Sequence, residues 1–156
     1  NQVAPHYEKF FISELVADAT QHYSVIAKEK NISLQSSIST TAPMVEADIS
    51  LMERVVQNLL SNAIKYTPEN GEITVNVKEQ SSGIEVEIEN SGEGIRQDDL
   101  PHIFDRYYKV DKSKSGIEGT GLGLAIVKKI LDLHNIQIRV NSTFGKSTSF
   151  SFSLPL

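Results

Sequence analysis

The sequence contains no cysteine, and only 9 glycines and 5 prolines occur among its 156 residues. Without cysteine there is no disulfide framework, no thiolate metal site and no cysteine nucleophile, and the composition fits a reducing compartment. The low glycine and proline content, with 39% hydrophobic and 22% charged residues, is typical of a globular chain rather than a disordered or fibrous one. A chain of this length is expected to fold as one domain.

Positive charge and long apolar runs are also scarce. Fifteen basic residues against twenty acidic ones give a net charge of −5, which argues against binding to nucleic acid. The longest uncharged stretch runs from Asn31 to Val45 and is rich in serine and threonine, so it is not expected to span a bilayer. No signal-peptide pattern opens the chain. We therefore expect a soluble domain.

The spacing of apolar residues predicts alternating helices and strands. Helical periodicity predicts helices over residues 13–30, with Ser13 as N-cap, 49–65 and 122–134. Period-two alternation predicts a strand at 32–34 and two antiparallel hairpins, which join 73–77 to 84–88 and 136–142 to 148–154. These elements imply an α+β fold, a two-layer sandwich in which the helices cover one face of a mixed sheet.

One polar stripe lies on the second predicted helix. Asn58, Asn62 and Lys65 follow one another at i, i+4 and i+7, so they share one side of the helix. Mg²⁺ takes oxygen ligands, and one neutral amide oxygen suffices when nucleotide phosphates supply the negative charge. Lys65 could meet those phosphates as a point charge. Taken alone, the stripe is more typical of an ordinary solvated helix edge than of a binding site.

Two glycine clusters suggest backbone that approaches a ligand closely. Asn90-Ser91-Gly92-Glu93-Gly94-Ile95 follows a predicted strand, where a plain turn remains an equal alternative. Gly119-Thr120-Gly121-Leu122-Gly123-Leu124 opens the third predicted helix, where bare amides and the helix dipole favour an anion. The second cluster is neither a Walker loop nor the dinucleotide fingerprint, because its glycine spacing and following residues differ from both. We interpret it as a phosphate cradle, with a purely structural helix start as the alternative.

A long segment separates the two glycine clusters. It begins with Ile103-Phe104-Asp105-Arg106-Tyr107-Tyr108-Lys109 and continues as a polar run to Glu118. Long loops of this kind are commonly functional lids or disordered segments. The aromatic residues could anchor a lid on the body of the domain, while Arg106 and Lys109 could reach phosphates.

In this order, the segments resemble the ATP-binding catalytic domain of two-component sensor histidine kinases, a branch of the GHKL superfamily also called HATPase_c. Residues 58–67 are similar to the family's N box, 90–95 to its G1 box, 103–108 to its F box and 119–124 to its G2 box. Thr148 and Phe150 match a family position at which the threonine lies near the adenine. The resemblance covers nearly the whole chain.

This resemblance implies the Bergerat fold, with a mixed sheet of ~5 strands, about three helices on one face and a flexible ATP lid at about residues 105–119. It implies ATP and Mg²⁺ as cofactors, with Asn62 as the metal ligand and Asn62, Lys65 and Arg106 as the catalytic residues. The cofactor-binding residues that it implies are Asn58, Asn62, Lys65, Tyr66, Asn90, Gly92, Gly94, Ile95, Tyr108, Lys109, Gly119, Thr120, Gly121, Leu122, Gly123, Leu124 and Thr148.

One residue departs from the family pattern. The G1 box usually begins with an aspartate that accepts a hydrogen bond from the adenine amino group, and here Asn90 takes that position. A neutral amide is a weaker acceptor, and an amide that turns round presents its NH₂ group instead. We therefore expect a smaller preference for ATP over GTP than an aspartate would give.

The resemblance further implies transfer of the γ-phosphate to a histidine on a separate helical dimerisation domain of the same kinase. None of the four histidines, His6, His22, His102 and His134, lies in the sequence that surrounds such an acceptor, so we expect the acceptor domain upstream of residue 1. The implied partners are that domain and a response regulator. We expect the isolated domain to be a cytoplasmic monomer, and the parent protein to be a homodimer that can be anchored in a bacterial inner membrane.

Two alternatives remain open at this level. One is an ATP-hydrolysing switch like the gyrase, chaperone and mismatch-repair members of the superfamily, which carry a glutamate one helical turn before the metal asparagine. Asn58 stands at that position and cannot accept a proton from water. The other is a nucleotide-sensing module without catalytic activity.

Overall fold

The computed structural model describes residues 4–106, 108 and 123–156. Within this part of the chain the helices are α1 (Ile12–Glu29), α2 (Ile49–Tyr66), α3 (Gly123–Leu133) and the short 3₁₀ helix η1 (Leu100–His102). The strands are β1 (Glu8–Phe10), β2 (Ser33–Ile38), β3 (Val45–Ala47), β4 (Glu72–Gln80), β5 (Gly83–Ser91), β6 (Arg139–Thr143) and β7 (Ser147–Pro155). None of these described helices is long and apolar enough to cross a membrane.

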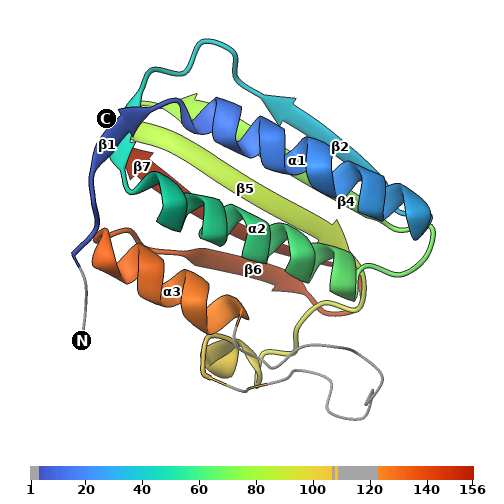
Figure 1. Cartoon of the computed structure of the whole chain (residues 1–156). Coiled ribbons are helices and arrows are strands. Elements are labelled where there is room, and N and C mark those ends of the chain that lie inside the picture. The colour runs from blue at the N-terminus through green and yellow to red at the C-terminus, as the bar shows by residue number, and fades with distance from the viewer. Residues whose placement is uncertain (1–3, 107, 109–122) are drawn as a thin grey trace.

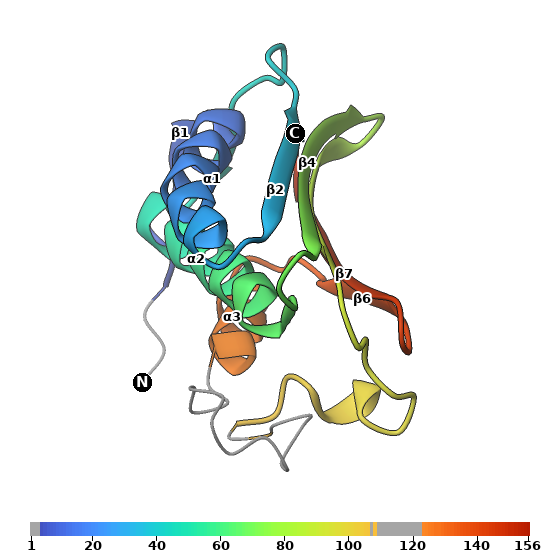
Figure 2. The ribbon, with the colours of Figure 1, turned by 90° about the vertical axis from the view of Figure 1, so that its right-hand side faces the viewer.

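Five strands form one mixed sheet in the order β2-β4-β5-β7-β6. The β2–β4 pair is parallel, and the other three pairs are antiparallel. Strands β1 and β3 form a separate antiparallel ribbon. Helix α2 lies between α1 and α3 (Figure 1), and all three helices lie on the same side of the large sheet (Figure 2). The predicted α+β fold, with helices on one face of a five-stranded mixed sheet, is confirmed.

Alternating side chains bind the helix layer to the sheet. The inward residues of the central strands are buried: Ile73, Val75 and Val77 on β4, Ile84, Val86 and Ile88 on β5, and Phe150, Phe152 and Leu154 on β7. Opposite them, α2 buries Met52, Val55, Val56, Leu59, Leu60, Ala63 and Ile64. Burying each large apolar side chain contributes about 1.5–3 kcal/mol, so this interface fixes α2 against the sheet.

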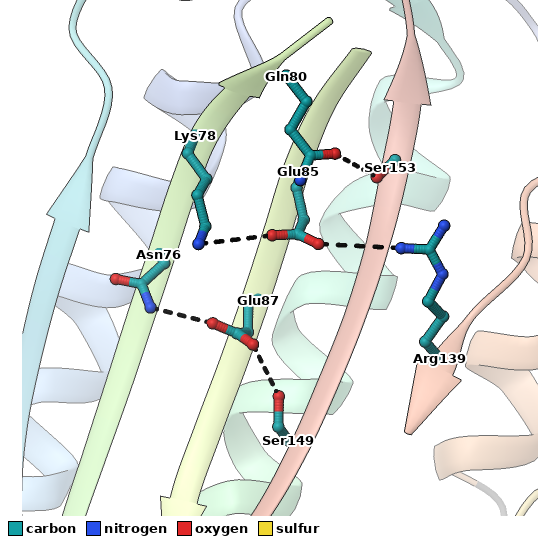
Figure 3. Close-up of polar contacts among 8 residues, drawn as sticks. All are labelled: Asn76, Lys78, Gln80, Glu85, Glu87, Arg139, Ser149 and Ser153. Atoms are coloured by element: carbon teal, nitrogen blue, oxygen red, sulfur yellow. Dashed lines mark hydrogen bonds and ion pairs between the residues drawn. The ribbon is translucent and has the colours of Figure 1, made fainter. Parts of the chain in front are cut away.

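The opposite face of the sheet carries polar side chains instead (Figure 3). Glu85 on β5 lies between Lys78 on β4, at 3.9 Å, and Arg139 on β6, at 4.0 Å. Two positions along, Glu87 accepts hydrogen bonds from Asn76 and Ser149. Because neighbouring residues of a strand point to opposite faces, this polar face leaves the apolar residues for the helix side.

Helix α2 has well-defined ends that fix the position of its polar stripe. Asp48 caps the first turn, where its Oδ1 accepts a hydrogen bond from the Leu51 N–H at 3.1 Å. At the other end, the Thr67 hydroxyl donates to the Ala63 carbonyl, and Pro68 follows. Residues before proline disfavour the helical conformation, so the helix ends where the proline predicts.

Several predicted details differ from the structure. Ser13 is not the N-cap: α1 begins at Ile12 after Phe11, and the Ser13 hydroxyl is buried without a hydrogen-bond partner among the described residues. The strand predicted at 32–34 extends to Ile38, because it pairs along its whole length with β4. The β1–β3 ribbon was not predicted, since three-residue strands are too short to show a period.

Candidate functional site

The polar stripe predicted on α2 is half-buried rather than fully solvated. Asn58, Asn62, Lys65 and Tyr66 all have intermediate exposure, beside the buried apolar face of the helix. The Lys65 ammonium lies over the Tyr66 ring, 5.2 Å from its centroid. These side chains are thus partly covered by the body of the domain and partly open to solvent.

The start of α3 meets this stripe. Gly123 is the first residue of α3, and the position a Cβ atom would occupy there lies 3.6 Å from Oδ1 of Asn58. Leu124 follows it and packs partly buried against the core. The N-terminal end of α3, where helix dipoles favour an anion, therefore lies beside the amide stripe of α2.

The loop after β5 is held against the end of α2. Gly92 has φ = 150°, and a Cβ atom there would lie 2.8 Å from the Tyr66 carbonyl oxygen. The Gly92 N–H donates to the Lys146 carbonyl at 3.0 Å. This close approach of two backbones requires a glycine, which is a specific reason for the first predicted glycine cluster.

The same loop is fastened to the turn between β6 and β7. Gly94 has φ = 74°, and a Cβ atom there would lie 2.5 Å from the Thr143 carbonyl oxygen. The Glu93 carbonyl accepts a hydrogen bond from the Gly145 N–H. Arg96 stacks on the exposed Phe144 ring, 4.6 Å from its centroid. Residues 92–96 are thereby a fixed wall next to α2.

Three polar side chains lie side by side at this end of the sheet, on its helix-facing side. Asn90 on β5 pairs in register with Thr148 on β7, which pairs with Ser142 on β6. We call these three residues the polar row. The Thr148 and Ser142 hydroxyl oxygens are 3.1 Å apart, and the Ser142 oxygen accepts a hydrogen bond from the Ile95 N–H at 2.7 Å.

The Asn90 amide is held in one orientation. Its NH₂ group donates to the Ser91 carbonyl at 2.9 Å, and the residue is only 6% exposed. Turning the amide round would bring its oxygen against that carbonyl oxygen, and two acceptors repel each other. The reorientation on which we based a weaker preference for ATP over GTP is therefore opposed in the structure.

The predicted F box packs partly on the core. Ile103 is buried, and the Phe104 ring meets the Phe150 ring edge to face, with centroids 6.2 Å apart. Tyr108 donates a hydrogen bond to Asp99, and this bond, with partial burial and the nearby carboxylates, raises the pKa of Tyr108. Arg106 is exposed and makes no hydrogen bond or ion pair with any described residue.

Five predicted site residues, Lys109, Gly119, Thr120, Gly121 and Leu122, lie outside the described residues. Arg106 and Tyr108 belong to the F-box segment, and Leu124 packs against the core. The remaining predicted residues fall into two groups. The first consists of Asn58, Asn62, Lys65 and Gly123 where α2 meets α3, and the second of Tyr66, Asn90, Gly92, Gly94, Ile95 and Thr148 around the G1 loop. Ser142 is an addition that no motif indicated, although the turn at Phe144-Gly145 predicts its pairing with Thr148.

The described residues fit a metal ion that is held mainly by its ligand's phosphates. Among residues 4–106, 108 and 123–156, no group of three His, Cys, Asp or Glu side chains could hold a metal. The Asn62 amide makes no hydrogen bond within that same part of the chain, so its oxygen is available. One amide oxygen with phosphates and waters is a coordination that Mg²⁺ accepts.

Comparisons with known proteins agree with the family resemblance. Residues 47–156 match the sequence pattern described as "Histidine kinase-, DNA gyrase B-, and HSP90-like ATPase". The adaptive-response sensory kinase SasA of Microcystis aeruginosa is 36% identical over 156 residues, which are 99% of this chain and 40% of SasA. The chain thus spans less than half the length of this relative.

Solved structures show the same similarity. The catalytic domain of histidine kinase ThkA superimposes with a TM-score of 0.82 at 27% identity, over 96% of this chain and 95% of ThkA's. In a second structure ThkA is in complex with the response regulator TrrA, and the match has a TM-score of 0.80 at 26% identity, over 97% of this chain and 42% of that chain.

Proposed function

Because the chain belongs to the histidine kinase-, DNA gyrase B- and HSP90-like ATPase family, we propose that it binds Mg-ATP and donates the γ-phosphate to a histidine on another domain. Its similarity to SasA and ThkA makes it a histidine kinase-type ATPase domain. The observation that carries the proposal is the approach of Gly123, at the start of α3, to Asn58 in the middle of α2.

That approach supplies complementary groups for a triphosphate. The first turn of α3 offers backbone N–H groups and the positive end of a helix dipole. The α2 stripe offers the amides of Asn58 and Asn62 and the ammonium of Lys65. In this proposal Asn62 holds Mg²⁺, which when bound neutralises phosphate charge, while Asn58 and Lys65 lie beside the phosphates.

The base would lie against the G1 loop. Tyr66 and Ile95 supply apolar surface at the end of α2 and at the loop, and Asn90 and Thr148 supply polar groups. The F-box contact of Phe104 with Phe150 would anchor the start of a lid at about residues 105–119. Arg106, Lys109 and the G2 glycines would then approach the phosphates from the lid side.

Phosphoryl transfer requires little bond-forming chemistry from the protein. Its transition state is loose, so catalysis consists mainly of positioning the γ-phosphate and neutralising its charge. The neutral imidazole of an acceptor histidine already carries a lone pair, so the domain needs no strong base. We place that acceptor on a helical dimerisation domain, in keeping with the greater length of SasA.

The wider setting is part of the same proposal. A response regulator would take the phosphoryl group from the acceptor, and the complex of ThkA with a response regulator supports this choice of partner. The parent protein would be a homodimer with this domain in the cytoplasm, and anchorage in a bacterial inner membrane would fit it. The isolated domain would be a monomer.

A nucleotide titration with and without Mg²⁺ tests the proposal. Asn62→Ala should reduce the gain in ATP affinity from Mg²⁺ about tenfold or more, because it removes the metal's only protein oxygen in this proposal. Gln57→Ala, at an exposed position on the same helix, should leave the gain unchanged. Gly121→Ala, in the predicted phosphate cradle, should weaken ATP binding at any metal concentration.

Two results would contradict the proposal. Calorimetry without a signal at millimolar ATP would exclude the nucleotide site. An unchanged metal dependence in Asn62→Ala would exclude Asn62 as the ligand while leaving nucleotide binding intact.

A further inference from the structure

The polar row ends an otherwise apolar layer of the sheet. In the next helix-facing row of side chains, Ile88, Phe150 and Val140 occupy the same three strands, and Phe150 pairs in register with both of the others. The helix-facing surface therefore changes from hydrocarbon to Asn90, Thr148 and Ser142 within one row. Thr148 and Asn90 are each 6% exposed, and buried polar groups of this kind need a defined hydrogen-bond arrangement.

The hydrogen bonds of Ser142 fix the direction of its neighbours. Its hydroxyl donates to the Ser147 carbonyl at 2.9 Å and accepts from the Ile95 N–H at 2.7 Å. A hydroxyl has one proton, and a carbonyl oxygen has none to give. In the 3.1 Å contact between Ser142 and Thr148, the proton therefore comes from Thr148.

The result is a row with two acceptors. The Thr148 oxygen, having given its proton to Ser142, offers only lone pairs to a ligand. The Asn90 NH₂ group is occupied by the Ser91 carbonyl, so this side chain offers its oxygen, which accepts no hydrogen bond among the described residues. Both polar groups that the proposed function places beside the base are therefore acceptors.

We propose that Ser142 is a positioning residue that makes Thr148 an acceptor, so that the polar row selects a base with an exocyclic amino group. The inference rests on the proposed nucleotide site. An amino group has two N–H donors to match two acceptors, whereas a 6-oxo group is itself an acceptor and would face them unpaired. An unpaired polar group in a buried site lowers affinity more strongly than a merely absent contact.

The test compares ATP with purine riboside 5′-triphosphate, which lacks only the 6-amino group. Wild-type protein should bind ATP about tenfold more tightly, the effect of a hydrogen bond or two in a buried site. Ser142→Ala should lower this ratio about threefold or more, since the Thr148 proton loses its acceptor and the hydroxyl can rotate. Ser142→Thr keeps a hydroxyl and should restore the ratio.

Two further variants separate positioning from stability. Thr148→Val should lower the ratio as Ser142→Ala does, and the double variant should lower it no further, because both changes break one hydrogen-bond chain. Ser149→Ala is the matched control, since Ser149 is buried next to Thr148 but bonds Glu87 on the opposite face. It should leave the ratio unchanged.

The outcomes are distinct. An unchanged affinity ratio in Ser142→Ala would overturn the inference. If both nucleotides also bind more weakly, by the same factor, the role of Ser142 is purely structural. An additive double variant would also overturn it. Failure of the wild type to bind either nucleotide would overturn the proposed function and this inference with it.

Discussion

Gly94 and Gly145 both have positive φ, but only Gly94 is closely surrounded by other atoms. Comparing alanine substitutions at the two positions therefore distinguishes the cost of backbone strain from the cost of a steric clash. Gly94 and Gly145 have φ = 74° and 83°, values that disfavour any side chain. A Cβ atom at Gly94 would lie 2.5 Å from the Thr143 carbonyl oxygen, whereas one at Gly145 would have nothing within 4 Å.

We therefore expect Gly94→Ala to lower the free energy of unfolding by about 1–3 kcal/mol more than Gly145→Ala does. Urea denaturation of both variants measures the difference, and Gly145→Ala serves as the control for strain alone, about 1–2 kcal/mol. Equal losses would show that the G1 loop is not clamped to the β6–β7 turn as the structure has it.

At the scale of elements, α2 depends on its cap. Partial burial disfavours the charged form of Asp48, but hydrogen bonds from the backbone N–H groups of His6 and Leu51 outweigh it and lower the pKa of Asp48. A depressed pKa in the folded state gives stability that is present above about pH 4 and is lost as the pH falls through the folded value.

Two substitutions of Asp48 distinguish the effect of its N-cap hydrogen bond from the effect of its carboxylate charge. Asp48→Ala should cost about 1 kcal/mol at neutral pH, because the helix loses its N-cap acceptor. Asp48→Asn keeps an acceptor, so it should cost less at pH 7, and its unfolding free energy should fall less than the wild type's between pH 7 and pH 3. Denaturation at both pH values measures this, and parallel pH dependences would contradict the role of the carboxylate.

The contact between α2 and α3 is the other feature at this scale. Each helix is amphipathic by itself, and their packing brings the amide stripe of one to the N-terminus of the other. The opposite ends of these helices are also linked, because the buried His134 ring accepts a hydrogen bond from the Asp48 N–H at 3.1 Å. The position of α3 relative to α2 is therefore fixed at both ends of α3.

At the scale of the whole molecule, we expect the chain to bind ATP without phosphorylating itself. His134 has both ring nitrogens occupied, one by Asp48 and the other, at 2.8 Å, by the Ile130 carbonyl, so neither is free to attack a phosphate. Incubation with γ-labelled ATP should give no phosphohistidine on His6, His22, His102 or His134. Addition of a matching acceptor domain should give label on that domain.

Label on any of the four histidines would contradict the placement of the acceptor elsewhere. Hydrolysis of ATP by the isolated chain should also be slow, since Asn58 cannot activate water. Rapid turnover would favour an ATP-hydrolysing switch, and binding without transfer to any acceptor would favour a nucleotide-sensing module.

Local patterns in the sequence determined much of this protein. The period of the apolar residues predicts α2 and both hairpins, and the order of four boxes identifies the family, because helical and strand periods and glycine-rich turns are local properties. The sequence was misleading at Ser13, where a typical capping residue lies within the first turn of the helix. The roles of all the site residues stay predictions, including those of Arg106, Lys109 and residues 119–122.

Only the tertiary structure decided which distant groups meet. The approach of Gly123 to Asn58 depends on how two helices pack, and the hydrogen bond from Ile95 to Ser142 joins residues 47 positions apart. The orientation of the Asn90 amide likewise depends on the backbone of Ser91 in the folded strand. Such contacts are set by the burial of the apolar layer between helices and sheet, a property of the whole chain that no local pattern contains.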